Sequence, residues 1–162
     1  MRDFGFKPVL IEVNRMRPSL CRLFALDEQR SLAALLSRDG SVMECVQYDP
    51  AGLAILPAGP ARRDAPSVPR LESALCCAVQ ELQNHFDFIL VDAPPILESA
   101  DVLVAGRLIP QVVLVVAAGQ TSSESLARVG EQLRDAGLTV VGTILNHRKR
   151  IIPKWIDRWL RK

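Results

Sequence analysis

No glycine in this sequence is followed by lysine, so the chain has no Gly-Lys-Ser/Thr loop of the kind that wraps nucleotide phosphates. No apolar run reaches the roughly 18–20 residues that a membrane-spanning helix needs. The first residues also lack the apolar core and the small-residue cleavage site of a signal peptide. We therefore expect a cytoplasmic chain that carries no phosphate loop of its own.

Residues that build metal or redox sites are scarce and scattered. The four cysteines (Cys21, Cys45, Cys76, Cys77) form no Cys-x-x-Cys pair and have no histidine at metal-ligand spacing, so we expect four reduced, structural thiols. The net charge of +2 is uneven, because residues 148–162 carry +6 and the remainder of the chain carries −4. Basicity confined to one end argues against a nucleic-acid-binding core and favours a local contact there.

Five short aliphatic segments bounded by turn residues indicate buried strands. They are Pro8–Val13, Leu53–Leu56, Phe86–Val91, Gln111–Ala117 and Thr139–Leu145. Helical patterns alternate with them, over Ser31–Ser37, Arg70–Asn84, Glu98–Leu108 and Ser122–Ala136. Near-continuous apolar strands alternating with helices predict a doubly wound α/β fold, with a mostly parallel sheet and helices on both faces. We expect one domain over residues 1–147, followed by a basic amphipathic helix over residues 148–162.

Local signals place some ends of these elements. Residues 121–124 (Thr-Ser-Ser-Glu) predict a capping box, in which Thr121 caps the helix and Glu124 reaches back to it. Gly137 predicts the end of the same helix. Asp101 is expected to start or cap its helix, with contact to a partner as the alternative.

A single carboxylate stands at the most informative position. The apolar strand Ile89-Leu90-Val91 delivers Asp92 to its C-terminal end, and Pro94 and Pro95 then stop the strand. Ligands of open α/β sheets bind at that edge, and an Asp there can hold Mg²⁺ through water. The alternative is a carboxylate that caps the following loop. The pattern favours a nucleotide site.

The ordered set of strand ends resembles the bacterial tyrosine kinases of exopolysaccharide and capsule assembly, in the MinD/ParA-like branch of P-loop NTPases. The matching pieces cover nearly the whole chain: Val9–Leu20, Gly52–Gly59, Phe86–Pro95 with Asp101, Val112–Gly119 and Val141–Asn146. The resemblance implies ATP and Mg²⁺ as cofactors and a membrane-embedded polysaccharide chain-length or export protein as partner. It also implies a possible homo-oligomer.

The resemblance assigns roles to individual residues. Asp92 would be the Walker B acid, acting on Mg²⁺ through water. The family's second acidic motif, Asp-x-Asp-x-Arg, falls on Glu12, Asn14 and Met16, and its first acid would coordinate Mg²⁺ or orient the attacking hydroxyl. Arg17 matches the Arg of the following Arg-Pro, and Asn146 matches the Asn that reads adenine.

The departures from the family are severe. Its first strand and phosphate loop would precede residue 1, and that loop supplies the charge stabilisation on which phosphoryl transfer depends. Asn14 and Met16 replace the motif's second Asp and its Arg, while the extra methylene of Glu12 displaces its carboxylate. Autophosphorylating members carry a C-terminal tyrosine cluster, whereas Tyr48 is the only tyrosine here. The missing strand would lie beside the Asp92 strand. We therefore expect a marginally stable chain, a rearranged sheet, or completion by another subunit.

The C-terminal segment has an apolar stripe opposite a basic face. Its apolar residues, Ile152, Trp155, Ile156, Trp159 and Leu160, keep helical spacing. Such a helix can lie in an anionic membrane interface, which would place the protein at the periphery of the inner membrane. The alternative is a helix that packs its tryptophans on the sheet.

Three functions fit these observations. The first, which we favour, is a catalytically impaired relative that acts as a regulatory or binding partner of the membrane-embedded assembly machinery. The second is a truncated form of an active ATP-dependent tyrosine kinase. The third is a MinD/ParA-like membrane-associated ATPase.

Overall fold

Short aliphatic strands and amphipathic helices build two separate compact units along the chain. The computed structural model describes residues 5–37, 41–61 and 68–148. Unit 1 comprises Met1–Ile109 and unit 2 comprises Pro110–Lys162. No helix of the described residues is long and apolar enough to cross a membrane. The predicted amphipathic helix over residues 148–162 lies outside the described residues, apart from Arg148.

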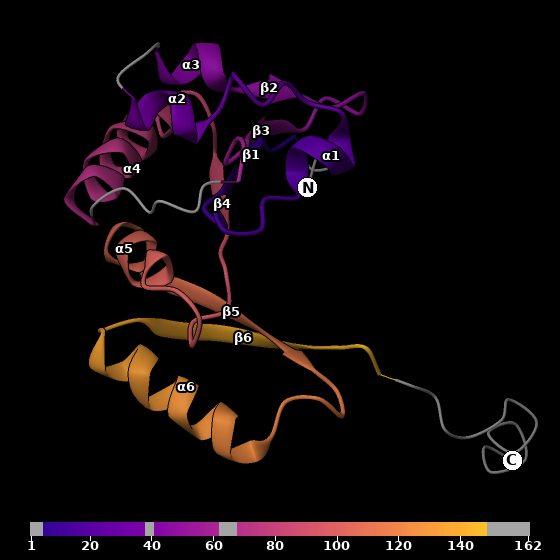
Figure 1. Ribbon diagram of the computed structural model, residues 1–162, viewed down its shortest axis with the longest axis vertical. Coiled ribbons are helices and arrows are strands. Elements are labelled where there is room, and N and C mark those ends of the chain that lie inside the picture. The colour runs from indigo at the N-terminus through magenta and orange to yellow at the C-terminus, as the bar shows by residue number, and fades with distance from the viewer. Residues whose placement is uncertain (1–4, 38–40, 62–67, 149–162) are drawn as a thin grey trace, which may run out of the picture. The chain divides into compact units, whose positions relative to one another are not determined.

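The sheet of unit 1 has four strands in the order β2-β3-β1-β4. Strands β1 (Pro8–Glu12), β3 (Ala54–Leu56) and β4 (Phe88–Asp92) are parallel, with β1 between the other two. The two-residue β2 (Gln47–Tyr48) pairs antiparallel with β3 at one edge (Figure 1). The parallel arrangement brings the C-terminal ends of β1, β3 and β4 to one side of the sheet, as the sequence predicts.

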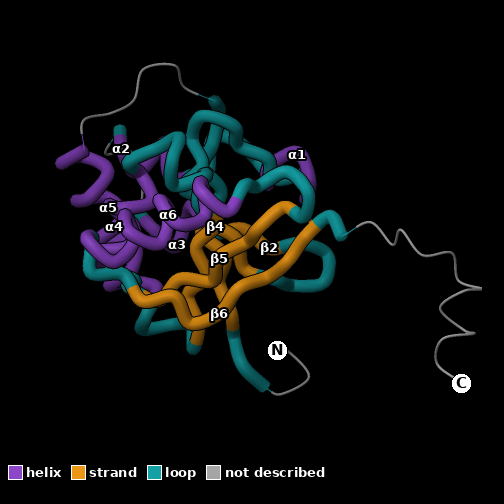
Figure 2. Tube along the Cα trace, turned by 90° about the horizontal axis from the view of Figure 1, so that it is seen from below, coloured by secondary structure: helices purple, strands orange, loops and turns teal. Residues whose placement is uncertain are grey.

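Among the residues of unit 1 that the structure describes, five helices accompany this sheet. They are α1 (Leu20–Phe24), α2 (Leu32–Leu36), α3 (Val42–Cys45), α4 (Val68–Leu82) and α5 (Asp101–Leu108). Helix α4 buries the stripe that its sequence predicts, including Leu71, Leu75 and Leu82. These residues share one core with Ile11 and Val9 of β1, both fully buried. The expected mostly parallel sheet with helices is therefore confirmed (Figure 2).

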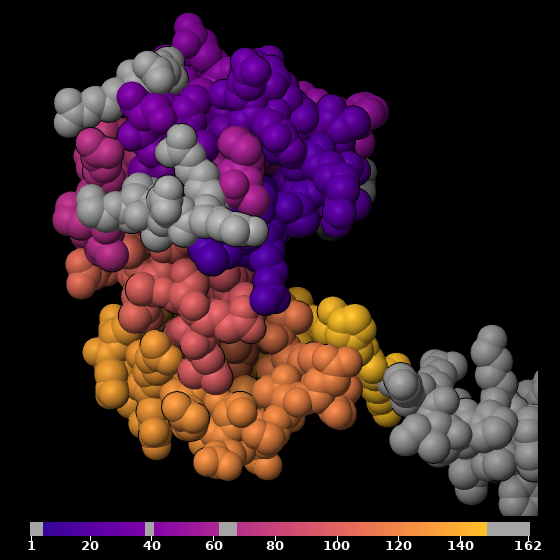
Figure 3. Space-filling model, viewed as in Figure 1, coloured from indigo at the N-terminus to yellow at the C-terminus, as the bar shows by residue number. Residues whose placement is uncertain are grey.

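In the described part of unit 2, residues 110–148, a parallel strand pair is accompanied by one helix. Strands β5 (Gln111–Ala117) and β6 (Thr139–Asn146) are joined through α6 (Ser123–Asp135). The register shifts between Val112 and Val113, where β6 holds one extra residue. The atoms of these three elements pack into one body (Figure 3).

The predicted capping box of α6 is wrong by one residue. Ser122, not Thr121, is the N-cap, and its Oγ accepts a hydrogen bond of 3.1 Å from the Ser125 N–H. Both residues are good caps, so the composition of the segment could not choose between them. The predicted end of the helix is confirmed, because Gly137 takes the left-handed conformation with φ of 72°.

Candidate functional site

Two carboxylates stand side by side where the parallel strands of unit 1 end. Asp92 is the last residue of β4, and the strand register aligns it with Glu12, the last residue of β1. The Val13 N–H donates to the Asp92 carbonyl oxygen at 2.9 Å, which extends the pairing beyond the strand end. The backbone therefore places the two predicted acids together.

Their surroundings differ sharply. Asp92 is exposed, whereas Glu12 has no exposed surface. Although Asp92 is exposed overall, neighbouring atoms remove part of the solvent around its carboxyl group, which raises the pKa of Asp92 above its usual value of 3.8, and the negative charge of Glu12 raises it further. No hydrogen bond to the Asp92 carboxylate is present among the described residues. Asp92 is therefore the acid with free coordination capacity.

Glu12 is instead bound into the fold. Its Oε1 accepts the backbone N–H groups of Ser19, at 2.6 Å, and Leu20, at 3.1 Å. Its Oε2 accepts the Ala58 N–H at 3.1 Å. The carboxylate thus joins the start of α1 and the segment after β3 to the end of β1. The longer side chain of Glu reaches these donors, and the predicted catalytic role of Glu12 stays a prediction.

The residues after β1 form a turn in which Asn14 is partly buried and Met16 and Arg17 are exposed. Asn14 Oδ1 accepts the Arg17 N–H at 3.2 Å, which closes the turn locally. The Arg17 guanidinium lies 3.9 Å from the Glu98 carboxylate, and both side chains are largely exposed. Met16, at the position of the family's Arg, is 57% exposed. The cofactor-binding roles of Asn14 and Arg17 also stay predictions.

A buried ion pair at this edge was not foreseen from the sequence. Arg15 Nη2 donates to both Asp101 carboxylate oxygens at 2.9 Å, and its Nε donates to Oδ2 at 3.2 Å. The side chains are 8% and 13% exposed. Asp101 begins α5, as predicted, and Ser99 Oγ accepts its N–H. The sequence did contain a signal for this pair. Arg15 lies one position before Met16, where the family's motif has its Arg.

Asn146 belongs to unit 2. It is the last residue of β6, where its carbonyl accepts the Ala118 N–H and its Oδ1 accepts the His147 N–H, both at 2.8 Å. Its position at a strand end agrees with the prediction. Its role toward adenine stays a prediction, because its measured contacts are all local.

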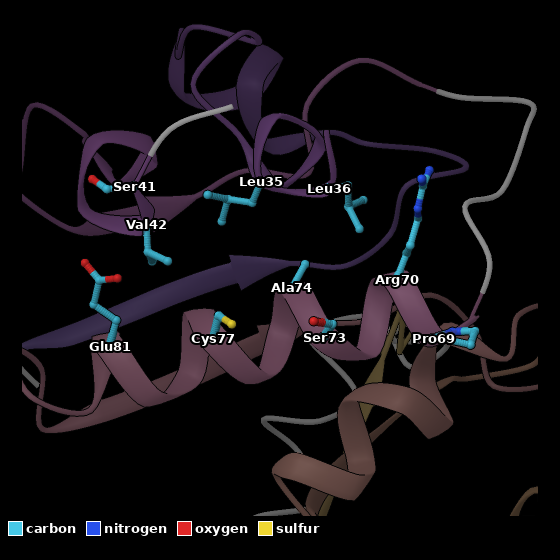
Figure 4. A pocket seen from close by; sticks show the side chains of 10 residues that line it. All are labelled: Leu35, Leu36, Ser41, Val42, Pro69, Arg70, Ser73, Ala74, Cys77 and Glu81. Atoms are coloured by element: carbon cyan, nitrogen blue, oxygen red, sulfur yellow. The ribbon is translucent and has the colours of Figure 1, made fainter. Parts of the chain in front are cut away.

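A groove of about 640 Å³ lies between α2, α3 and α4, with side chains from all three helices around it (Figure 4). Leu35, Leu36, Val42 and Ala74 supply its apolar part, and Arg70 and Glu81 are its charged residues. Neither Asp92 nor Glu12 lines it. This groove is therefore separate from the paired carboxylates.

The donor set at the strand ends fits Mg²⁺ only as part of a larger site. No group of three or more His, Cys, Asp or Glu side chains that could hold a metal occurs within the described ranges. Mg²⁺ commonly keeps several waters and uses one or two carboxylates together with substrate phosphates. Asp92 suits such a water-mediated contact, whereas the oxygens of Glu12 are already engaged.

The curated proteins most similar to this chain include bacterial tyrosine-protein kinases. CapB of Staphylococcus aureus is 29% identical over 143 residues, which are 88% of this chain and 62% of CapB. The tyrosine-protein kinase YwqD of Bacillus subtilis is 28% identical over 148 residues, which are 90% of this chain and 61% of YwqD. The chain therefore spans less than two thirds of either relative. No protein-family model matches it.

Solved structures agree with this relationship at the level of fold. The chimerical protein CapA2B2 superposes with a TM-score of 0.82 at 18% identity, covering 92% of this chain and 66% of that one. The kinase domain of VpsO superposes with a TM-score of 0.79 at 25% identity, and the match covers 89% of this chain and 71% of the VpsO domain. The cell division ATPase MinD of Pyrococcus furiosus superposes with a TM-score of 0.70 at 20% identity, and the match covers 98% of this chain and 68% of MinD. The chain has a P-loop NTPase fold, and its resemblance to bacterial tyrosine kinases is confirmed.

Proposed function

We propose that this relative of bacterial tyrosine-protein kinases is a catalytically impaired component of exopolysaccharide or capsule biosynthesis. It acts as a regulatory or binding partner of a membrane-embedded chain-length or export protein. The observation that carries the proposal is the burial of Glu12, whose oxygens accept three backbone N–H groups. A carboxylate used in this way has little capacity left for Mg²⁺ or for a substrate hydroxyl.

The groups that remain would hold a nucleotide only weakly. Bound ATP and Mg²⁺ would supply the phosphates and their neutralising charge. Asp92 would hold water of the metal shell, and Asn14 and Arg17, on the turn after β1, would contact the nucleotide. Residues 1–162 contain no Gly-Lys pair, and Met16 stands where the family's motif has Arg, so neither feature supplies a cation here for transition-state charge.

Calorimetric titration of the full chain with ATP·Mg²⁺ tests the loss of catalysis. Wild type and Asp92→Ala should both give negligible heats, and phosphate release should stay at background. The matched control is Asp87→Ala, an exposed carboxylate just before the same strand. Tight binding in wild type and in Asp87→Ala that disappears in Asp92→Ala would instead support an active kinase site.

The proposed partner is tested separately. We expect the chain to co-purify with the chain-length protein of its own organism when the two are co-expressed, and Asp92→Ala should leave that association unchanged. ATP-dependent association that Asp92→Ala abolishes would favour a MinD/ParA-like switch. Attachment to lipid through Ile152, Trp155, Ile156 and Trp159, which lie outside the described residues, is tested by co-sedimentation with phosphatidylglycerol vesicles. Vesicle binding that the double substitution Trp155→Ala/Trp159→Ala abolishes would favour the membrane-associated alternative.

A further inference from the structure

The groove between α2, α3 and α4 plays no part in the function proposed above. Its described lining residues all belong to unit 1, so its walls are built without unit 2. Leu35 and Leu36 of α2 and Val42 of α3 form one wall, which is apolar, and α4 forms the other (Figure 4). Apolar surface rimmed by polar side chains is typical of a protein–protein contact.

One stripe of α4 faces this groove. Arg70, Ala74, Cys77 and Glu81 line it, at successive spacings of four, three and four residues. That spacing is typical of the seam along which two helices pair. The core of unit 1 takes the opposite face of α4, which leaves the stripe for contact outside unit 1.

The charges of the stripe are complementary to themselves. Arg70 and Glu81 lie at opposite ends of the groove, about 16 Å apart along the axis of α4 (Figure 4). Neither forms an ion pair with another residue that the structure describes. The midpoint between Arg70 and Glu81 is also the midpoint between Ala74 and Cys77. A second α4 that runs in the opposite direction about this midpoint therefore brings its Glu81 to Arg70 and its Arg70 to Glu81. A parallel second helix would bring like charges together.

We propose that the groove is the contact surface between two copies of this chain, which pair through antiparallel α4 helices around a two-fold axis. A two-fold contact uses the same surface of both copies, so that surface must be complementary to itself. The short side chains of Ala74 and Cys77 allow close approach at the centre, and Leu35 and Val42 add apolar surface beside them. The two ion pairs set the direction and register of the helices, because ion pairs near a surface contribute little affinity of their own.

Chemical cross-linking at Cys77 tests this contact in the full-length protein. Of the four cysteines, Cys77 is the exposed one, and it lies next to the proposed axis. We expect a short bismaleimide to give a covalent dimer of the wild type. Cys77→Ser should abolish that dimer, whereas Cys76→Ser, at the neighbouring position on a different side of α4, should keep it.

Charge reversal tests the pairing of the helices. Arg70→Glu and Glu81→Arg each bring like charges together at both ends of the contact, so each variant alone should lose at least tenfold in cross-linked dimer. When the two variants are mixed, both contacts again join opposite charges, and the dimer should return. Arg22→Glu is the matched control, at an exposed residue of α1 outside the groove, and should leave the yield unchanged.

Several results would overturn the proposal. One is a wild type that gives no dimer dependent on Cys77. Another is a pair of charge-reversed variants, shown by circular dichroism to be folded, that cross-link as well as the wild type or that fail to cross-link with each other when mixed. Cross-linking of Cys77 only to a co-expressed chain-length protein would assign the groove to that partner instead. None of these results depends on whether the chain binds ATP.

Discussion

At the scale of single residues, the carboxylate of Glu12 is a hydrogen-bond acceptor that joins separate segments. The side chain of Glu12 extends past the strand end and accepts N–H groups from two other segments. Charged hydrogen bonds of this kind contribute about 1.5–3 kcal/mol each, and a donor left without a partner adds a penalty. Glu12 therefore contributes to the stability of this end of the sheet.

Glu12→Gln should be strongly destabilising. One carboxylate oxygen becomes an NH₂ group that faces a backbone N–H donor, so at least one hydrogen bond is lost. We expect a loss of about 2–3 kcal/mol in the free energy of unfolding, measured by urea denaturation. Glu98→Gln, whose side chain is 57% exposed, should change stability by less than about 0.5 kcal/mol. Equal effects of the two substitutions would show that the Glu12 bonds contribute little.

Asp92 should make stability depend on pH in the direction opposite to that of a salt-bridged acid. Its pKa is raised in the folded chain, so its favourable contribution is complete below the unfolded pKa and is lost as pH rises through the folded pKa. Asp92→Asn removes this charge. The variant should therefore gain stability relative to wild type at neutral pH, and the gain should vanish in acid. A gain that is the same at every pH would contradict the assignment.

At the scale of elements, the ion pair between Arg15 and Asp101 ties the exit of β1 to the start of α5. Sequence patterns identified β1 and α5 with nearly correct bounds, because each has its own apolar period. They could not identify the pair, since its partners are 86 residues apart and each also fits a solvent-exposed position. The short α1, α3 and β2 were missed for a related reason: two to five residues are too few to establish a period.

A double-mutant cycle measures the interaction between Arg15 and Asp101. Arg15→Met and Asp101→Leu should each cost about 3–5 kcal/mol, because each leaves a buried charge without its partner. The double variant should recover most of that loss, since it removes both charges together. Thermal or urea unfolding of the four proteins gives the coupling free energy. Additive losses in the double variant would indicate that the two side chains do not interact.

At the scale of the whole molecule, the sequence was sufficient for the fold class and for the strand ends that carry Asp92, Glu12 and Asn146. The apolar periodicity of the strands and helices determines the fold class, and the common direction of parallel strands determines which strand ends lie on one side of the sheet. The hydrogen-bond partners of Glu12 depend on where α1 and the segment after β3 come to lie, which is a property of the tertiary fold. These strand ends could therefore be located from the sequence, while the hydrogen bonding of Glu12 could not.

Strand β4 bears on how the molecule associates. Among the described strands it pairs with β1 alone, and its apolar residues Phe88 and Leu90 are 40% and 46% exposed. An apolar strand with an unpaired edge promotes association between chains. We expect concentration-dependent self-association in sedimentation experiments, and Leu90→Lys should reduce it. Leu23→Lys, at a residue 71% exposed on α1, should not.

The hydrogen bonds of Glu12 limit what substitution can do at this end of the sheet. Freeing its carboxylate would remove the contacts that join β1, the start of α1 and the segment after β3. A second available acid beside Asp92 would therefore have to come from a different position. Asn14→Asp, on the turn after β1, would supply one and would leave those contacts in place.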